Sequence, residues 1–252
     1  YCIANLMNNG LVYIIWRMYR KHFRGLSFLF ADMCFQTLGA MFLLLRGVMP
    51  DLVSIVLTNL FSISGLLCTL IGLELFFDQS RPRIYNYFVF AIYMFLIVHF
   101  ATSQENLLAR NFFLSSMVIF FNGQSSYLLF REIQPESRRM ARFTASILLA
   151  YCVFSIARMV AMVLLPQPGN DFFQSGIVNS VAMVVYSSLN ILFTAGLIIM
   201  ISQRVLNEAQ TEKDKYNKAF NSSPYAMLLT KVSDGRIFEV NEGFVRMTGY
   251  QA

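Results

Sequence analysis

Seven long apolar stretches dominate this chain, and they constrain its fold more than any other feature. They occupy residues 2–18, 25–45, 52–77, 84–101, 107–130, 143–165 and 174–202. A helix needs about 20 mainly apolar residues to cross a hydrocarbon layer about 30 Å thick. Five of the six prolines fall between these stretches and none lies inside one, which favours unbroken helices. The pattern predicts an all-α polytopic membrane bundle of about seven transmembrane helices.

The supply of charged residues also favours a membrane protein, with the lipid bilayer as its main partner. Only 13% of the residues are charged and 56% are apolar, whereas a soluble domain has about 25% charged residues. The net charge of +6 does not indicate nucleic-acid binding, because the basic residues form short clusters between the apolar stretches. All four cysteines lie in apolar stretches, so we expect neither a disulfide framework nor a metal site.

Lysine and arginine are concentrated in alternate loops, which predicts the orientation of the chain. The rich loops carry Arg20, Lys21 and Arg24; Arg81 and Arg83; Arg131, Arg138, Arg139 and Arg142; and Arg204, Lys213, Lys215 and Lys218. The alternate loops contain Arg46 alone. Because basic loops stay in the cytoplasm, we predict an N-terminus outside the cell and a cytoplasmic C-terminus.

A polar segment follows the last apolar stretch. In residues 203–219 and just beyond, a 3-4-3-4 spacing of the kind found in coiled coils joins Leu206, Ala209, Lys213, Tyr216 and Phe220. We call these five positions the seam. A seam predicts a parallel homodimer below the membrane, with residues 203–219 acting as a signalling helix. The alternative is an ordinary solvated extension of the last helix.

The end of the chain predicts a β-hairpin followed by a short helix. Residues 226–231 and 236–240 are the expected strands, and Gly235 can take the positive φ that the turn needs. Asn241 is suited to cap a helix through Met247, and Gly249 is suited to end it.

This order of elements resembles the opening of a PAS domain. The resemblance is carried by Phe220, Ser223, Pro224, Asp234, Gly235, Arg236, Ile237, Val240, Asn241, Phe244, Thr248, Gly249 and Tyr250. It covers residues 219–252, an early part of such a domain. The expected organisation is therefore a transmembrane sensory domain in residues 1–202, the signalling helix in residues 203–219, and the N-terminal part of an α+β PAS domain in residues 220–252.

The whole arrangement is similar to bacterial membrane-bound sensor proteins. The resemblance implies a multi-pass protein of the bacterial inner membrane whose PAS domain precedes an output domain, either a diguanylate cyclase (GGDEF) or a histidine kinase. Neither output is encoded in these residues, and we expect no catalytic residue among them. In the membrane part the resemblance is one of general plan, without a motif that identifies a ligand.

Charged residues inside apolar stretches are candidates for ligand binding because burying them is costly. Arg158 lies seven residues before Leu165, about 10 Å below the outer end of its stretch. With Arg110, Arg46 and His99 it is expected to form a basic pocket for a carboxylate or a lipid headgroup. The alternatives are interfacial anchoring of Arg46 and Arg110, and internal pairing of Arg158. The acidic candidates for that pairing are Glu105, Asp51 and Asp171.

Other polar residues are expected to have structural roles. Asp32 and Glu74 are predicted to form ion pairs with Arg17 or the inner basic loops, and so to fix how the helices pack. Interhelical hydrogen bonds are expected for Asn59, Asn122, Gln124, Asn179 and Asn190.

The inventory of residues excludes several functions. Retinal attachment needs a lysine within a stretch, and haem ligation needs two facing histidines; the chain offers neither, so no cofactor is expected. A membrane enzyme lacks a catalytic set. The remaining hypotheses are a sensor for a small amphipathic or lipid-like ligand and, as the alternative, a transporter or channel with a regulatory PAS domain.

Overall fold

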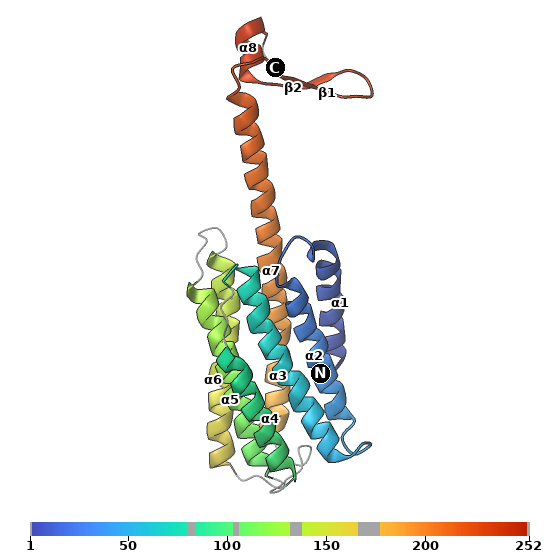
Figure 1. Ribbon diagram of the computed structural model, residues 1–252, viewed down its shortest axis with the longest axis vertical. Coiled ribbons are helices and arrows are strands. Elements are labelled where there is room, and N and C mark those ends of the chain that lie inside the picture. Colours follow the sequence, from blue (N-terminus) through green and yellow to red (C-terminus); the bar gives the residue numbers. More distant parts are fainter. Residues whose placement is uncertain (1, 80–83, 103–105, 132–137, 166–176, 251–252) are drawn as a thin grey trace. The chain divides into compact units, whose positions relative to one another are not determined.

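A computed structural model describes residues 2–79, 84–102, 106–131, 138–165 and 177–250. Its long helices are α1 (Cys2–Tyr19), α2 (Leu26–Leu44), α3 (Asp51–Phe76), α4 (Ile84–Thr102), α5 (Leu107–Arg131), α6 (Arg138–Leu164) and α7 (Ile177–Asn221) (Figure 1). Each coincides with one predicted apolar stretch to within a few residues, except that α7 runs on far beyond residue 202. The predicted start of the seventh stretch at Gln174, and the loop residues Arg81 and Arg83, lie outside the described residues.

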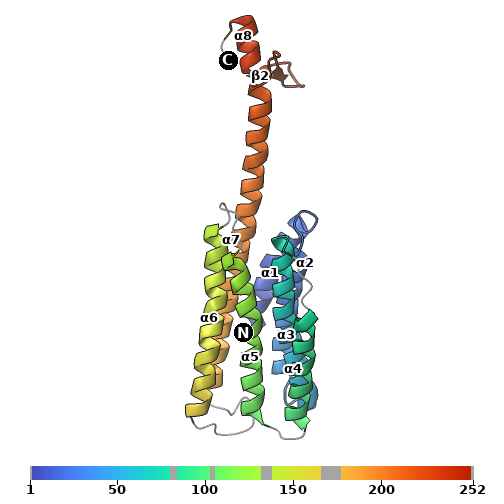
Figure 2. The same ribbon diagram turned by 60° about the vertical axis from the view of Figure 1, so that its left-hand side comes forward.

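The chain divides into two compact units, Tyr1–Met200 and Ile201–Ala252, with the boundary inside α7. In the first unit the helices run side by side, as both ribbon views show (Figures 1 and 2). Helix α2 packs extensively against α3, as α5 does against α6, and α3 also packs against α4 and α5. Adjacent helices along the chain are therefore mostly neighbours in space, as short connections require.

Within the described residues, five helices are long and apolar enough to cross a membrane: α2, α3, α4, α6 and α7. The predicted count was about seven. The other two helices contain polar residues that are buried in the bundle, such as Asn8 of α1 and Asn122 of α5. Such residues lower the average hydropathy of a helix without facing the surroundings.

The outer surface of the bundle is apolar. On one face of α4, Ile84, Phe88, Ile92 and Phe95 are between 59% and 72% exposed. Asn86 of the same helix is buried at 3% exposure and bonds to Gln124 of α5. This arrangement is the reverse of a water-soluble helix, and it matches a helix whose surroundings are hydrocarbon.

Glycines let α2 and α3 approach closely. Gly25, which precedes α2, has φ +85°, and a Cβ atom on it would collide with the carbonyl oxygen of Gly72. At Gly65 a Cβ atom would lie 2.5 Å from Oδ1 of Asp32. Small residues at helix interfaces are typical of membrane bundles, where close backbone packing drives association.

The second unit contains the predicted hairpin and short helix. Strands β1 (Leu228–Thr230) and β2 (Ile237–Val240) pair antiparallel, with Leu228 opposite Val240, and helix α8 (Glu242–Thr248) follows. Gly235 takes φ +71° in the turn, and Gly249 takes φ +74° at the end of α8. Both glycines thus have the positive φ expected of them from the sequence.

Asn241 joins the parts of this unit. It is fully buried, and its side-chain oxygen accepts hydrogen bonds from the backbone N–H of Met227 at 2.8 Å and of Phe244 at 2.9 Å. Its Nδ2 donates to the carbonyl oxygens of Phe220 and Tyr225, both at 2.9 Å. One side chain therefore connects the end of α7, the entry to β1 and the start of α8.

The seam residues differ in exposure. Leu206, Ala209, Lys213 and Tyr216 are exposed in the single chain, whereas Phe220 is buried. The Tyr216 ring stacks on Phe220 with centroids 5.5 Å apart, and its hydroxyl donates to Glu239 of β2 at 3.2 Å. Local desolvation, together with the charge and hydrogen bond of Glu239, raises the pKa of Tyr216 above its ordinary value. Tyr216 and Phe220 thus have packing roles within the chain, and the seam as a dimer contact stays a prediction.

Candidate ligand cavity in the helix bundle

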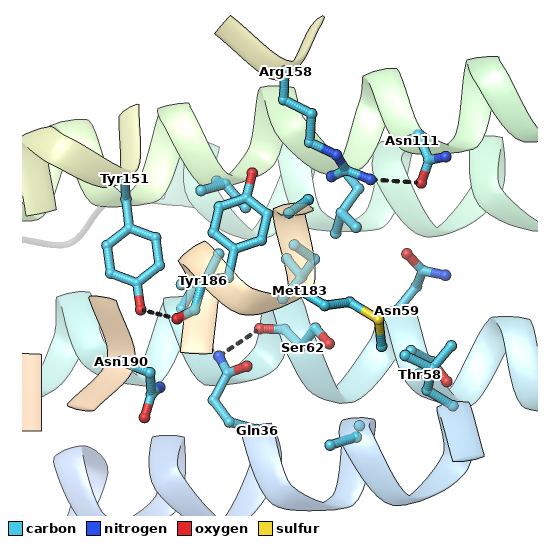
Figure 3. A pocket seen from close by; sticks show the side chains of 18 of the residues that line it. Gln36, Thr58, Asn59, Ser62, Asn111, Tyr151, Arg158, Met183, Tyr186 and Asn190 are labelled. Atoms are coloured by element: carbon cyan, nitrogen blue, oxygen red, sulfur yellow. Dashed lines mark hydrogen bonds between the residues drawn. The ribbon is translucent and has the colours of Figure 1, made fainter. Parts of the chain in front are cut away.

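The first unit contains a partly open cavity of about 190 Å³. Side chains from α2, α3, α5, α6 and α7 line it, and ten of the lining residues are labelled in Figure 3. The lining is mainly apolar with interspersed amides, hydroxyls and three arginines. Such a mixture is common in sites that bind small organic molecules.

Arg158 of α6 is the most deeply buried cation in the lining, at 5% exposure. Its Nη2 donates to the side-chain oxygens of Asn111 at 3.1 Å and Asn179 at 2.9 Å, and its Nη1 donates to Ser115 at 3.4 Å. In Figure 3 the side chain extends from α6 towards Asn111 on α5. Arg158 therefore connects α6 with α5 and α7 through neutral acceptors.

Tyr186 lies next to this arginine, and Tyr151 packs on Tyr186. The Arg158 guanidinium carbon is 5.8 Å from the ring centre of Tyr186, whose hydroxyl is 2.9 Å from that of Ser155. The Tyr151 ring is stacked on Tyr186 at 5.9 Å with an interplanar angle of 13°, and its hydroxyl donates to the Tyr186 carbonyl oxygen at 3.3 Å (Figure 3). The pair gives one wall of the cavity a rigid aromatic surface.

Another polar group in the lining surrounds Asp32 of α2. Oδ2 accepts a hydrogen bond from Thr69 of α3 at 2.6 Å, and Oδ1 accepts one from Gln36 at 3.2 Å. Gln36 also donates to the carbonyl oxygen of Ser62 at 3.3 Å (Figure 3). The predicted ion pair of Asp32 with Arg17 is therefore wrong, because neutral donors occupy both oxygens and Arg17 is exposed. Glu74 is buried on α3, outside the cavity lining.

Helix α7 contributes a continuous row of polar residues to the bundle. Asn179 accepts from Arg158, and Asn190 accepts from Nδ2 of Asn8 on α1 at 3.0 Å. The Thr194 hydroxyl lies 3.7 Å from the sulfur of Met33 on α2. Together with Tyr186, these residues bring α7 into contact with α1, α2 and α6.

Three of the four predicted ligand-binding residues line the cavity, namely Arg158, Arg110 and Arg46. His99 is not among the lining residues; it is exposed near the end of α4, with its ring edge-on to Phe100. We therefore remove His99 from the candidate site. Of the acidic partners considered for Arg158, Asp51 is exposed at the start of α3, while Glu105 and Asp171 lie outside the described residues.

The amides predicted to make interhelical bonds mostly do so. Asn59 accepts from the Tyr93 hydroxyl at 2.7 Å, and Gln124 donates to Asn86 at 3.1 Å. Asn122 is buried at 2% exposure in the cavity lining, and its Nδ2 has no hydrogen-bond partner among the described residues. The described residues also contain no cluster of His, Cys, Asp and Glu suited to a metal ion.

Sequence reasoning missed Asn111, Ser115, Tyr151 and Tyr186. Asn111 and Ser115 are four residues apart and therefore share one face of α5. That spacing, next to Arg110 in the same apolar stretch, was a usable signal. Nothing local distinguishes Tyr151 and Tyr186 from the other tyrosines in apolar stretches.

Comparison with known families adds one finding, in the second unit. Residues 214–252 match the family model of the PAS domain. The match begins within α7 and includes the hairpin and α8, so the predicted resemblance of this part of the chain is confirmed. We refer to residues 214–252 as the PAS segment. No curated protein and no solved structure matches the chain.

Proposed function

We propose that this chain is the membrane part of a signal sensor. In this proposal all seven long helices cross the membrane, and a small amphipathic ligand binds in the outer half of the bundle. Helix α7 passes the signal to the PAS segment and to an output domain of the diguanylate cyclase or histidine kinase type. A bacterial inner membrane is the proposed location, with the N-terminus outside.

One observation carries the proposal: α7 belongs to both the cavity and the PAS segment. Its residues Asn179, Tyr186 and Asn190 line the cavity, and the helix runs without interruption to Asn221, past the start of the PAS segment. A change in the packing of these side chains has a covalent helical route out of the bundle.

The Arg158–Asn179 hydrogen bond is the proposed point of control. A ligand that binds the Arg158 guanidinium competes with Asn179, and so weakens the contact between α6 and α7. A ligand shifts a conformational equilibrium only by its difference in affinity for the two states. A ligand that competes with Asn179 for the Arg158 guanidinium binds more tightly when the Arg158–Asn179 bond is broken than when it is formed, and so has the required difference in affinity.

The seam supports the output side of the proposal. Four of its five positions are exposed on α7, which leaves them free to contact a second chain in a parallel homodimer. A change in α7 then alters how two PAS segments face each other. The transporter alternative has less support, because transporter sites are commonly built from interrupted helices, and each long helix is continuous over its described bounds.

Cysteine cross-linking in native membranes tests this function. The native cysteines are replaced by alanine, and Ala209→Cys on the seam is compared with Thr211→Cys on the opposite face. We expect faster disulfide formation at position 209. We also expect Arg158→Met to change that rate, whereas Arg142→Met, which removes the same charge from an exposed site on α6, does not. Equal rates at positions 209 and 211 would refute the dimer, and a rate insensitive to Arg158→Met would refute control by the cavity.

A further inference from the structure

We infer that the cavity binds a small carboxylate with an apolar body about the size of one aromatic ring, and that Arg158 holds the carboxylate. This inference rests on the proposed function, because it names the class of ligand for the same site. Four independent features of the lining carry it: its charge, its hydrogen-bond donors, its size and its aromatic wall.

The buried positive charge of Arg158 in the lining favours an anionic ligand. Arg158 is the most deeply buried arginine of the lining, and both oxygens of the Asp32 carboxylate already accept hydrogen bonds from Thr69 and Gln36. Among the described residues, the acceptors that Arg158 contacts are all neutral. A cation buried at 5% exposure within a membrane bundle is costly unless an anion compensates it.

Some hydrogen-bonding groups in the lining lack a partner among the described residues, and they favour a ligand that accepts hydrogen bonds. In the lining they include Nε of Arg158, Nδ2 of Asn122 and the Thr58 hydroxyl. The first two are donors only, and both belong to residues that are at least nine-tenths buried. An ionised carboxylate is acceptor-only, and a guanidinium binds it through two parallel bonds. A neutral alcohol or an amine would satisfy these groups less completely.

The size of the cavity limits the apolar part of the ligand. A cavity of about 150 Å³ lined by apolar side chains accommodates benzene, so about 190 Å³ holds one ring with a carboxyl group. The Tyr186 ring lies beside Arg158 and is stacked on Tyr151, and a bound aromatic ring favours such neighbours in offset or edge-on arrangements. The volume and the aromatic wall together favour a ligand whose apolar part is a single ring.

Benzoate is the probe that tests this inference. The full chain is placed in lipid nanodiscs, and binding is measured by calorimetry with benzoate and with benzamide, which has the same shape without the charge. We expect saturable binding of benzoate at millimolar concentrations or below, and binding of benzamide at least about 10-fold weaker. Equal binding of the two, or no saturable binding of benzoate, would overturn the inference. Binding of palmitate without benzoate would also overturn it.

Variants locate the carboxylate. Arg158→Met is expected to weaken benzoate binding by at least about 30-fold, and Arg158→Lys by about 5- to 10-fold, because lysine keeps the charge but loses the planar fork. Arg142→Met is the matched control and should bind as the wild type does. Unchanged affinity in Arg158→Lys and Arg158→Met would place the anion elsewhere. If Arg158→Met fails to fold, Arg158→Lys and the benzamide comparison still decide the matter.

A last variant separates an external carboxylate from an internal one. In the double variant Glu105→Gln, Asp171→Asn, we expect benzoate to bind with unchanged affinity. A large gain in affinity would show that one of these side chains occupies the site, and would overturn the inference. Cross-linking at the seam is independent of benzoate, so failure of benzoate to bind does not by itself refute the sensor.

Discussion

The two units of this chain hold their polar residues by different means. In the first unit, buried polar side chains bond to partners far away in the sequence: Asn8 to Asn190, Thr194 to Met33 and Arg158 to Asn111. In the second unit, the bonds of buried Asn241 all reach residues no more than 21 positions away. The first unit thus contains polar contacts that span much more of the sequence than those of Asn241.

The difference follows from the proposed surroundings of each unit. Between helices in lipid there is no hydrophobic driving force, so close packing at small residues and polar pairs determine which helices meet. In water, a hairpin and a short helix are only marginally stable by themselves. Capping hydrogen bonds and turn geometry then stabilise them. Perturbing one representative of each mechanism therefore tests the comparison.

The largest effect is expected at Gly25, where α2 meets α3. Gly25→Ala forces a Cβ atom onto the Gly72 carbonyl oxygen and strains a residue with φ +85°. We expect it to lower the free energy of unfolding in mixed micelles by more than about 3 kcal/mol.

Gly47→Ala is the matched control for that change. Gly47 has nearly the same φ, +89°, and, its two chain neighbours aside, no atom of the described residues lies within 4 Å of an added Cβ. Its cost should be about 1–2 kcal/mol, from the backbone alone. Equal costs at the two glycines would show that close approach of α2 and α3 does not stabilise the bundle.

The second effect concerns the local bonds of the PAS segment. Asn241→Ala removes four hydrogen bonds at once, so amide exchange at Met227 and Phe244 should accelerate by at least about 10-fold. Exchange in α2 to α6 should not change. Asn207→Ala in α7 is the control, and mass spectrometry provides the measurement. Acceleration throughout the bundle would mean that the second unit does not owe its order to local bonds.

This contrast explains what the sequence could predict. The hairpin, the cap at Asn241 and the positive φ of Gly235 and Gly249 were predictable because their signals lie within a few residues. The apolar stretches predicted the helices for the same reason. The partners of Asp32 and the position of His99 were not predictable, because they depend on how helices rotate against one another. Average hydropathy does not show which face of a helix is buried. For α1 and α5, the prediction of a membrane span from the sequence therefore disagrees with the average hydropathy of the helix.

A smaller effect is expected at the Asn8–Asn190 pair. A double-mutant cycle with Asn8→Ala and Asn190→Ala should give a coupling energy of about 0.6 kcal/mol, and not above about 1.7 kcal/mol. The value is modest because amides in the unfolded membrane-embedded chain also find partners. A coupling energy indistinguishable from zero would remove this pair from the contacts that specify the bundle.

The smallest effect is expected on the exposed face of α7. Lys215 and Glu212 form an ion pair at 2.9 Å, with side chains 67% and 74% exposed. Exposed pairs of this kind contribute little, so Lys215→Met should leave both thermal unfolding and seam cross-linking unchanged. A clear loss of cross-linking would instead indicate that Lys215 contacts a second chain.

Helix α7 is proposed to carry the signal from the cavity to the PAS segment, and amide exchange in the PAS segment measures this transmission. Exchange over residues 214–250 is compared in nanodiscs between the wild type, Arg158→Met in the cavity and Arg142→Met on the exposed face of α6. We expect altered exchange at the C-terminal end of α7 and in the hairpin for Arg158→Met alone. Identical exchange in all three proteins, with the bundle still folded, would contradict it.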